Sequence, residues 1–153
     1  MRVLVDTTVW SLALRRRAGV LNEEQALLRQ ELTDLIADDR VAIVGPVRQE
    51  VLSGVRDPAT LDRLRLRLLA FEDAPLDTDD FETAARMHNR CRQAGISGSV
   101  VDLLLCAVAQ RRELSIFTTD ADFTRYGTVL PIALHYPAGS RTPPEAAPRS
   151  TPR

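Results

Sequence analysis

The segment Val3-Leu4-Val5-Asp6 constrains the fold more than any other stretch of this sequence. Three consecutive apolar residues are typical of a strand that is covered on both faces, as in the middle of a parallel sheet. A helical pattern begins within two residues of Asp6, so the carboxylate would lie at the carboxyl end of the strand. Ligands bind at this edge of open α/β sheets. Asp6 is therefore either a functional carboxylate or the N-cap of the next helix, a position that Asp also favours.

Strand-like and helix-like patterns alternate along the chain. Apolar runs at 41–44 and 115–118 predict two further buried strands, and residues 129–133 predict an edge strand. Amphipathic patterns predict helices at residues 8–17, 22–37, 47–53, 57–71, 78–94 and 98–109. This alternation is typical of an α/β fold with three layers, α/β/α, around a mostly parallel central sheet.

We expect one domain at residues 1–135, because 153 residues are enough for one core and too few for two. Residues 136–153 contain Pro, Ala, Ser, Thr and Arg without an apolar period, which predicts a disordered tail. No apolar run approaches the ~18 residues needed to cross a membrane, and Met1-Arg2 leads into a strand instead of a signal peptide. We therefore expect a cytoplasmic protein without a membrane partner.

The basic residues are all arginine, since the sequence holds 20 of them and no lysine. This absence excludes a P-loop lysine, a Schiff base and the lysine partner of an aspartyl-phosphate. It argues against a phosphoacceptor receiver domain and a haloacid-dehalogenase-like phosphatase, and the phosphatase would also need a second aspartate at Thr8. The net charge of −1 provides no global attraction to nucleic acid and leaves an enzyme with a local basic patch open.

Two more acids stand in unusual positions. Glu50 follows the second strand and has no arginine three or four residues away that would pair with it on a helix. Asp102 lies in a helix whose other residues are almost all apolar, where an ionised carboxylate is costly unless it is paired or binds a metal. Ser99, three residues earlier, offers an alternative in which Asp102 belongs to a capping box. That box normally uses Glu or Gln, so we favour a functional carboxylate.

The strand at 115–118 also ends in carboxylates, Asp120 and Asp122. Asp122 alone is better explained as the N-cap of a helical turn through Tyr126, whereas Asp120 lies closer to the strand end and is the stronger candidate. If the strands are neighbours, Asp6, Glu50, Asp102 and Asp120 converge on one edge, where their mutual repulsion would force some to protonate. A hard divalent cation removes this problem, and oxygen-only ligands are those that Mg²⁺ or Mn²⁺ prefers. Such an ion can activate water to attack a phosphodiester.

Several arginines lie close to this edge in the predicted fold. They are Arg15, Arg16 and Arg17 at the end of the first helix, and Arg48 in the helix that carries Glu50. The first three either complement the helix dipole or contact phosphates. We treat all four as hypothetical phosphate contacts.

Four ordered segments resemble the motifs of PIN domains, and more narrowly those of VapC-type toxins of bacterial toxin–antitoxin pairs. They are Val5-Asp6-Thr7-Thr8-Val9-Trp10, Gln49-Glu50-Val51, Ser99-Val100-Val101-Asp102 and Phe117-Thr118-Thr119-Asp120-Ala121-Asp122-Phe123. The resemblance covers residues 1–135 in order and spacing. It implies a metal-dependent endoribonuclease, often a homodimer, that is held inactive by a small cognate antitoxin whose peptide fills the active-site groove.

The resemblance also implies roles for individual residues. The acidic site would comprise Asp6, Glu50, Asp102 and Asp120, of which Asp6, Asp102 and Asp120 hold Mg²⁺ or Mn²⁺ and Glu50 completes the shell or orients the attacking water. Supporting positions would be Thr8, Thr119 and Asp122, with the division of labour between Asp120 and Asp122 left open. Hydrolysis of RNA would leave a 5′-phosphate and a 3′-hydroxyl.

Two alternatives give different expectations. A metal-independent ribonuclease would have to use His88 and His135, and both are expected at the surface. A catalytically inactive RNA-binding or scaffold domain with the same fold would show no metal-dependent turnover, and the complete set of four acids argues against it.

Overall fold

A four-stranded parallel sheet forms the centre of the protein, with the strand order β2-β1-β3-β4. The computed structural model describes residues 1–15 and 18–140. The strands are β1 (Val3–Val5), β2 (Val41–Ala42), β3 (Ser115–Phe117) and β4 (Ala133–Leu134). The first of them lies between β2 and β3 and is fully buried, as its three apolar residues predict.

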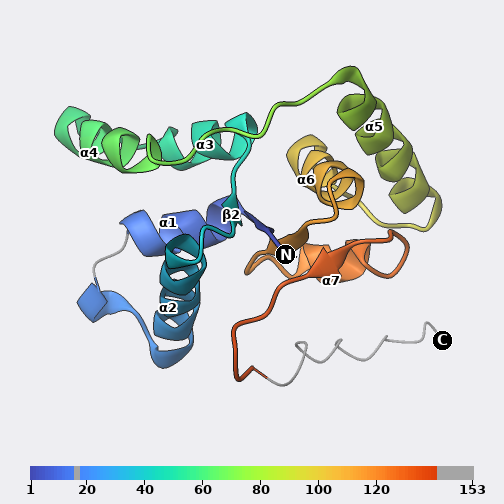
Figure 1. Ribbon diagram of the computed structural model, residues 1–153. Coiled ribbons are helices and arrows are strands. Elements are labelled where there is room, and N and C mark those ends of the chain that lie inside the picture. Colours follow the sequence, from blue (N-terminus) through green and yellow to red (C-terminus); the bar gives the residue numbers. More distant parts are fainter. Residues whose placement is uncertain (16–17, 141–153) are drawn as a thin grey trace.

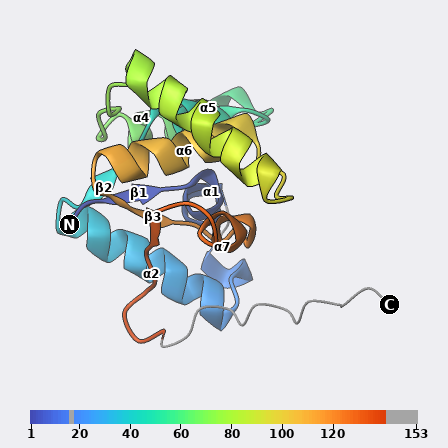
Figure 2. The same ribbon diagram turned by 90° about the vertical axis from the view of Figure 1, so that its right-hand side faces the viewer.

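Helices cover both faces of this sheet. Their bounds are α1 (Thr7–Arg15), α2 (Glu23–Ala37), α3 (Gly45–Leu52), α4 (Pro58–Leu68), α5 (Thr78–Gln93), α6 (Val100–Arg111) and α7 (Asp122–Tyr126), with a short 3₁₀ turn η1 (Ala18–Val20). Figure 2 shows α6 against one face of the sheet with α5 outside it, and α2 against the opposite face. Figure 1 shows α3 and α4 extending beside α1. The predicted three-layer α/β/α fold with a parallel sheet is confirmed.

The edge strands differ from the sequence-based expectation. The N–H groups of Val129 and Leu130 both donate to the carbonyl of Tyr126, so these residues continue the turn after α7 and the strand begins only at Ala133. At the other edge, Ile43 forms an isolated parallel bridge with Asp73 beyond the end of β2. The sheet is therefore shorter at both edges than the apolar runs suggest.

Side-chain caps start several helices where the sequence places Asn, Asp or Ser. Asn22 and Gln25 form a reciprocal capping box at α2, and Asp57 accepts the N–H of Thr60 at α4. Caps of this kind stabilise a helix by about 1 kcal/mol each. The apolar side chains of α2 are only partly buried, because Leu32 and Leu35 enter the core while Leu27 remains 63% exposed.

The segment that follows β4 lies against α2. His135, expected at the surface, is mostly buried and pairs through Nε2 with Glu31 Oε1 at 2.7 Å. The N–H of Ala138 donates to the other carboxylate oxygen of Glu31 at 3.2 Å. Of the tail predicted at 136–153, residues 141–153 lie outside the described residues. Within 1–15 and 18–140, no helix has the length and apolar character needed to span a membrane.

Asp80 in α5 is a fully buried carboxylate, with no exposed surface. Arg112 donates to both of its oxygens at 2.7 and 2.8 Å, and Arg111 donates at 2.5 Å. The hydrogen bonds from Arg112 hold the pKa of Asp80 well below its ordinary value of 3.8. Asp80 lies in the first turn of α5, where its charge complements the helix dipole. It also ties the start of α5 to the end of α6.

We predict that Asp80→Asn lowers the free energy of unfolding at neutral pH by about 2 kcal/mol. Breaking a fully buried ion pair costs about 3–5 kcal/mol, and the two arginines here are partly exposed. Urea denaturation followed by circular dichroism measures the difference. Glu82→Gln, at an exposed position of the same helix, is the matched control and should change stability little.

The same ion pair makes the stability of the protein depend on pH. Because the pKa of Asp80 is lowered in the folded protein, its ion pairs contribute fully to the free energy of unfolding above pH 3.8. This contribution is lost as the pH falls below that value. The difference between wild type and Asp80→Asn should therefore shrink in acid. An equal difference at every pH would contradict this electrostatic account.

Candidate active site

Asp6 lies at the carboxyl end of β1 and is 5% exposed. Its carboxylate accepts hydrogen bonds from the N–H of Thr7 at 2.8 Å and from the hydroxyls of Thr118 and Thr8 at 2.7 and 3.2 Å. Thr118 reaches it because Val5 pairs with Phe117 in the parallel ladder, so the next residue on each strand lies side by side. The side chain binds the first N–H of α1, whereas an ordinary N-cap would bind the second or third.

Burial raises the pKa of the Asp6 carboxyl above its ordinary value, and the negative charge of Glu50 adds to this rise. The hydrogen bonds from Thr118, Thr7 and Thr8 act in the opposite direction because they stabilise the charged form. Asp6 is thus a buried carboxylate that is held in one orientation by three donors, close to a second acid.

Asp102 lies in the first turn of α6 and is half-buried. Ser99 caps this helix by accepting the N–H of Asp102 at 3.0 Å, which is one half of the predicted capping box. The carboxylate does not form the other half and instead accepts the Tyr126 hydroxyl at 2.9 Å. Burial raises the pKa of Asp102, and the charges of Asp6 and Asp120 raise it further. The structure therefore favours the functional interpretation of this residue over the capping box.

Asp122 is the first residue of α7, and Asp120 lies two residues before it. Asp120 Oδ1 accepts the N–H of Asp122 at 2.9 Å, so Asp120 provides the side-chain bond that the sequence suggested for Asp122. The N–H of Asp120 in turn donates to the Thr118 hydroxyl at 3.0 Å. Asp122 forms an ion pair with Arg125 one turn later in α7.

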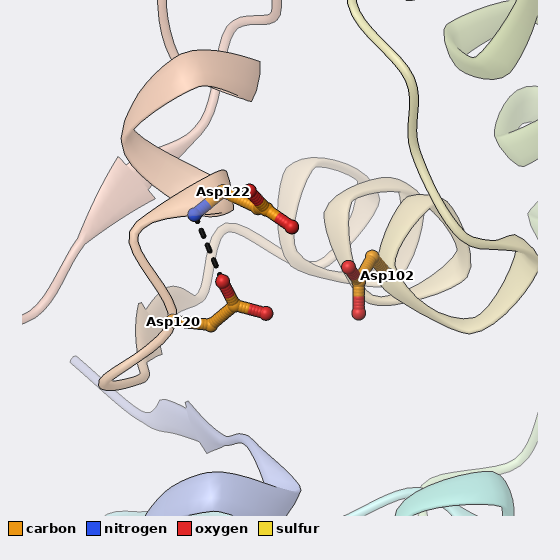
Figure 3. Close-up of side chains that lie close together, drawn as sticks. All are labelled: Asp102, Asp120 and Asp122. Atoms are coloured by element: carbon orange, nitrogen blue, oxygen red, sulfur yellow. Dashed lines mark hydrogen bonds between the residues drawn. The ribbon is translucent and has the colours of Figure 1, made fainter.

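Three of these aspartates form one compact group. Asp102, Asp120 and Asp122 each present a carboxylate oxygen, and these oxygens lie within 4.8 Å of one another (Figure 3). Figure 3 shows Asp102 reaching from α6 toward the two aspartates at the start of α7. An oxygen-only set, in which the charge of Asp120 contributes to the raised pKa of Asp102, fits a hard cation such as Mg²⁺ or Mn²⁺. The predicted set of Asp6, Asp102 and Asp120 differs, because Asp122 belongs to the compact group and Asp6 does not.

Asp6 and Glu50 share a cleft with this group. The cleft measures about 530 Å³, and its lining includes Asp6, Thr7, Thr8, Glu50, Asp102, Thr119 and Asp120. Glu50 is exposed at its margin and accepts the Thr7 hydroxyl through Oε2 at 3.0 Å. The structure thus brings the four predicted acids into one cleft on four different segments of the chain.

The hydroxyls around the site differ from the prediction in one respect. Thr8 accepts the N–H of Thr119 at 3.1 Å, and Thr119 contributes this backbone group rather than its hydroxyl. The hydroxyl between Asp6 and Asp120 belongs to Thr118, which sequence reasoning did not select. Tyr126 was also missed. The alignment of Val5 with Phe117 would have identified Thr118, but the sequence carries no local signal for Tyr126.

The four arginines proposed as phosphate contacts lie in different surroundings. Arg48 Nε donates to Asp73 at 2.9 Å, and its two other nitrogens donate to the carbonyls of Leu68 and Phe71 at 2.9 and 2.5 Å. This guanidinium ties α3 to the end of α4, which argues against an RNA contact. Arg15 is exposed at the end of α1, outside the acidic cleft. Arg16 and Arg17 lie outside the described residues.

The two histidines do not line the acidic cleft. His88 lies in α5, and His135 is engaged with Glu31. This arrangement provides no histidine pair for metal-independent cleavage within the described part of the chain.

Comparison with known proteins agrees with the fold and with the family that the sequence resembles. The family model of the PIN domain matches residues 3–129. Ribonuclease VapC11 from Mycobacterium tuberculosis is 34% identical over 127 residues, which cover 79% of this chain and 88% of that protein.

Solved structures share the fold at lower sequence identity. FitAcB from Neisseria gonorrhoeae superposes with a TM-score of 0.69 at 22% identity and covers 88% of this chain and 97% of its own. VapBC-5 from Mycobacterium tuberculosis, described as a member of the VapBC family of toxin–antitoxin systems, gives 0.62 at 20% identity, with 88% and 98% covered. The match to the family model and the identity to VapC11 together show that the chain belongs to the PIN domain family.

Proposed function

We propose that this protein is a Mg²⁺- or Mn²⁺-dependent endoribonuclease that acts as the toxin of a toxin–antitoxin pair. The observation that carries the proposal is the convergence of Asp6, Glu50, Asp102 and Asp120 in one cleft, with Asp122 beside them. The curated relative VapC11 is named a ribonuclease, which supports RNA as the substrate.

In this proposal the compact group of Asp102, Asp120 and Asp122 holds the cation, and Asp6 supports it from the strand end. A bound Mg²⁺ or Mn²⁺ ion would lower the pKa of a water molecule and neutralise charge that develops on the phosphodiester. Hydrolysis would leave a 5′-phosphate and a 3′-hydroxyl. Two observations support a bound cation: the donor set contains only oxygen atoms, and the charge of Asp120 raises the pKa of Asp102.

The neighbouring residues hold these acids in position. The Thr118 hydroxyl donates to Asp6 and accepts from the N–H of Asp120, so one side chain links two of the acids. Tyr126 fixes the carboxylate of Asp102. Glu50 is oriented through Oε2 by Thr7, and Oε1 accepts no hydrogen bond among residues 1–15 and 18–140. We assign Glu50 Oε1 the role of accepting a proton from the attacking water.

We also propose that a small cognate antitoxin neutralises the enzyme by placing a peptide in the acidic cleft, and that the enzyme is a homodimer. The structural similarity to VapBC-5, a member of a toxin–antitoxin family, supports the first of these partners. Both are further implied by the resemblance of the four acidic motifs to VapC-type toxins.

Cleavage of total RNA by the purified protein tests the central proposal. We expect discrete fragments with Mg²⁺ or Mn²⁺ and none with EDTA. Asp102→Asn should slow cleavage by about 100-fold or more, because loss of a cation ligand removes several kcal/mol of transition-state stabilisation. Asp34→Asn, at an exposed position of α2, is the matched control and should cleave like the wild type.

Two results would contradict this assignment. Cleavage that survives both EDTA and Asp102→Asn would exclude the carboxylate site as the source of activity. Absence of cleavage by folded protein that is free of antitoxin and supplied with metal would favour the catalytically inactive RNA-binding domain.

We predict that Tyr126→Phe and Thr118→Val each weaken Mn²⁺ binding and RNA cleavage by about 10-fold, in the range found for residues that orient metal ligands. Tyr126→Phe keeps the ring against Phe123 and removes only the hydroxyl that lowers the pKa of Asp102. Isothermal titration calorimetry measures the Mn²⁺ affinity. Thr33→Val on α2 is the control, and unchanged Mn²⁺ affinity in both site variants would argue against their positioning role.

A further inference from the structure

A second cleft, which we call the arginine cleft, lies at the opposite end of α1 from the acidic site. It measures about 600 Å³, and its lining includes four arginines, Arg15, Arg56, Arg63 and Arg67. All four side chains are exposed. Figure 1 shows α4 above the C-terminal end of α1. Residues of both helices line the cleft.

The charges in this cleft are nearly all positive. Its one acidic residue is Asp57, and that carboxylate already accepts the N–H and the hydroxyl of Thr60 at 3.0 and 2.6 Å as the cap of α4. Four positive groups against one capped carboxylate leave a net charge of about +3, in a protein whose total charge is −1. Such a concentration of positive charge attracts a polyanion.

The arrangement of α4 places its contribution on one face. Thr60, Arg63, Leu64 and Arg67 follow the helical spacing i, i+3, i+4 and i+7, and all of them line the cleft. Arg65, between them, faces elsewhere and pairs with Asp62 at 3.8 Å. The structure therefore separates the arginines of α4 into two sets.

Two helices connect the arginine cleft to the acidic site. Thr7 and Thr8 at the start of α1 line the acidic site, and Arg15 at its end lines the arginine cleft, about 10 Å further along the helix. The segment from α3 onward also joins the two clefts, since Glu50 in α3 lies at the acidic site and Val55 and Arg56 after it line the arginine cleft. A short stretch of extended polymer would therefore reach both sites.

We propose that the arginine cleft binds the sugar–phosphate backbone of the RNA strand, a few nucleotides away from the phosphodiester in the acidic site. This inference rests on the proposed ribonuclease function. The acidic site repels the phosphates of its own substrate, and positive charge at the other end of α1 compensates for that repulsion. An acidic protein segment would also be attracted to the arginines. The connection to the acidic site favours RNA, because only RNA has a phosphodiester for that site to cleave.

The test measures binding of a short fluorescent single-stranded RNA by anisotropy at several salt concentrations. The full chain carries Asp102→Asn, and EDTA is present, so that the probe is not cut. Removing two phosphate contacts with Arg63→Gln and Arg67→Gln should lower the slope of log affinity against log salt by about 1.4, or about 0.7 for each contact. Lysine at both positions should restore most of the slope, since it keeps the charge.

Arg65→Gln combined with Arg90→Gln is the matched control, because it removes the same charge from exposed positions outside the arginine cleft. Equal slopes for this control and for the cleft variant would overturn the inference. So would unchanged RNA binding by the cleft variant together with weaker binding of the antitoxin, which would assign the cleft to a protein partner.

Cleavage by the same arginine variants with intact Asp102 separates the two proposals. If the wild type cleaves RNA and the cleft variant binds and cleaves like it, the arginine cleft is not an RNA site and the ribonuclease function stands. If the wild type neither binds nor cleaves RNA, both proposals fail.

Discussion

The parallel pairing of β1 with β3 is the interaction on which the candidate site depends. It aligns Val5 with Phe117 and thereby sets Asp6 beside Thr118 at the carboxyl edge of the sheet. The same threonine accepts the N–H of Asp120, so the ladder also fixes the start of the loop that carries the other aspartates. A shift of this register by one residue would turn Thr118 to the other face of the sheet and leave Asp6 buried without its shortest hydrogen bond.

The fold brings together charges that repel one another. Burial and neighbouring carboxylates raise the pKa values of Asp6 and Asp102, and hydrogen bonds from threonine and tyrosine hydroxyls only partly offset this effect. A cation at the compact aspartate group would relieve the repulsion within the protein. The arginine cleft at the far end of α1 would relieve the repulsion between the protein and a polyanionic substrate. The cation and the arginine cleft would both compensate for the concentration of negative charge in the acidic cleft.

The acids could be identified from the sequence because each carries a local signal. Asp6 and Asp120 end apolar strands, Glu50 lacks a helical partner, and Asp102 interrupts an apolar helix. The sequence did not reveal side chains whose role depends on tertiary contacts. Tyr126 meets Asp102 only because α7 packs beside the start of α6, and Arg48 donates to carbonyls at and beyond the end of α4, which argues against an RNA contact. Edge strands were also placed incorrectly, since turn hydrogen bonds after α7 override the β propensity of Val129.

Location of Mn²⁺ by anomalous diffraction, from crystals of the protein grown with that ion, would test most directly whether the clustered carboxylates form a metal site. We expect an anomalous peak within coordination distance of Asp102, Asp120 and Asp122, with Asp6 close by. A protein that binds no ion in the acidic cleft at saturating Mn²⁺, or binds it only elsewhere, would contradict the assignment of these residues as a metal centre.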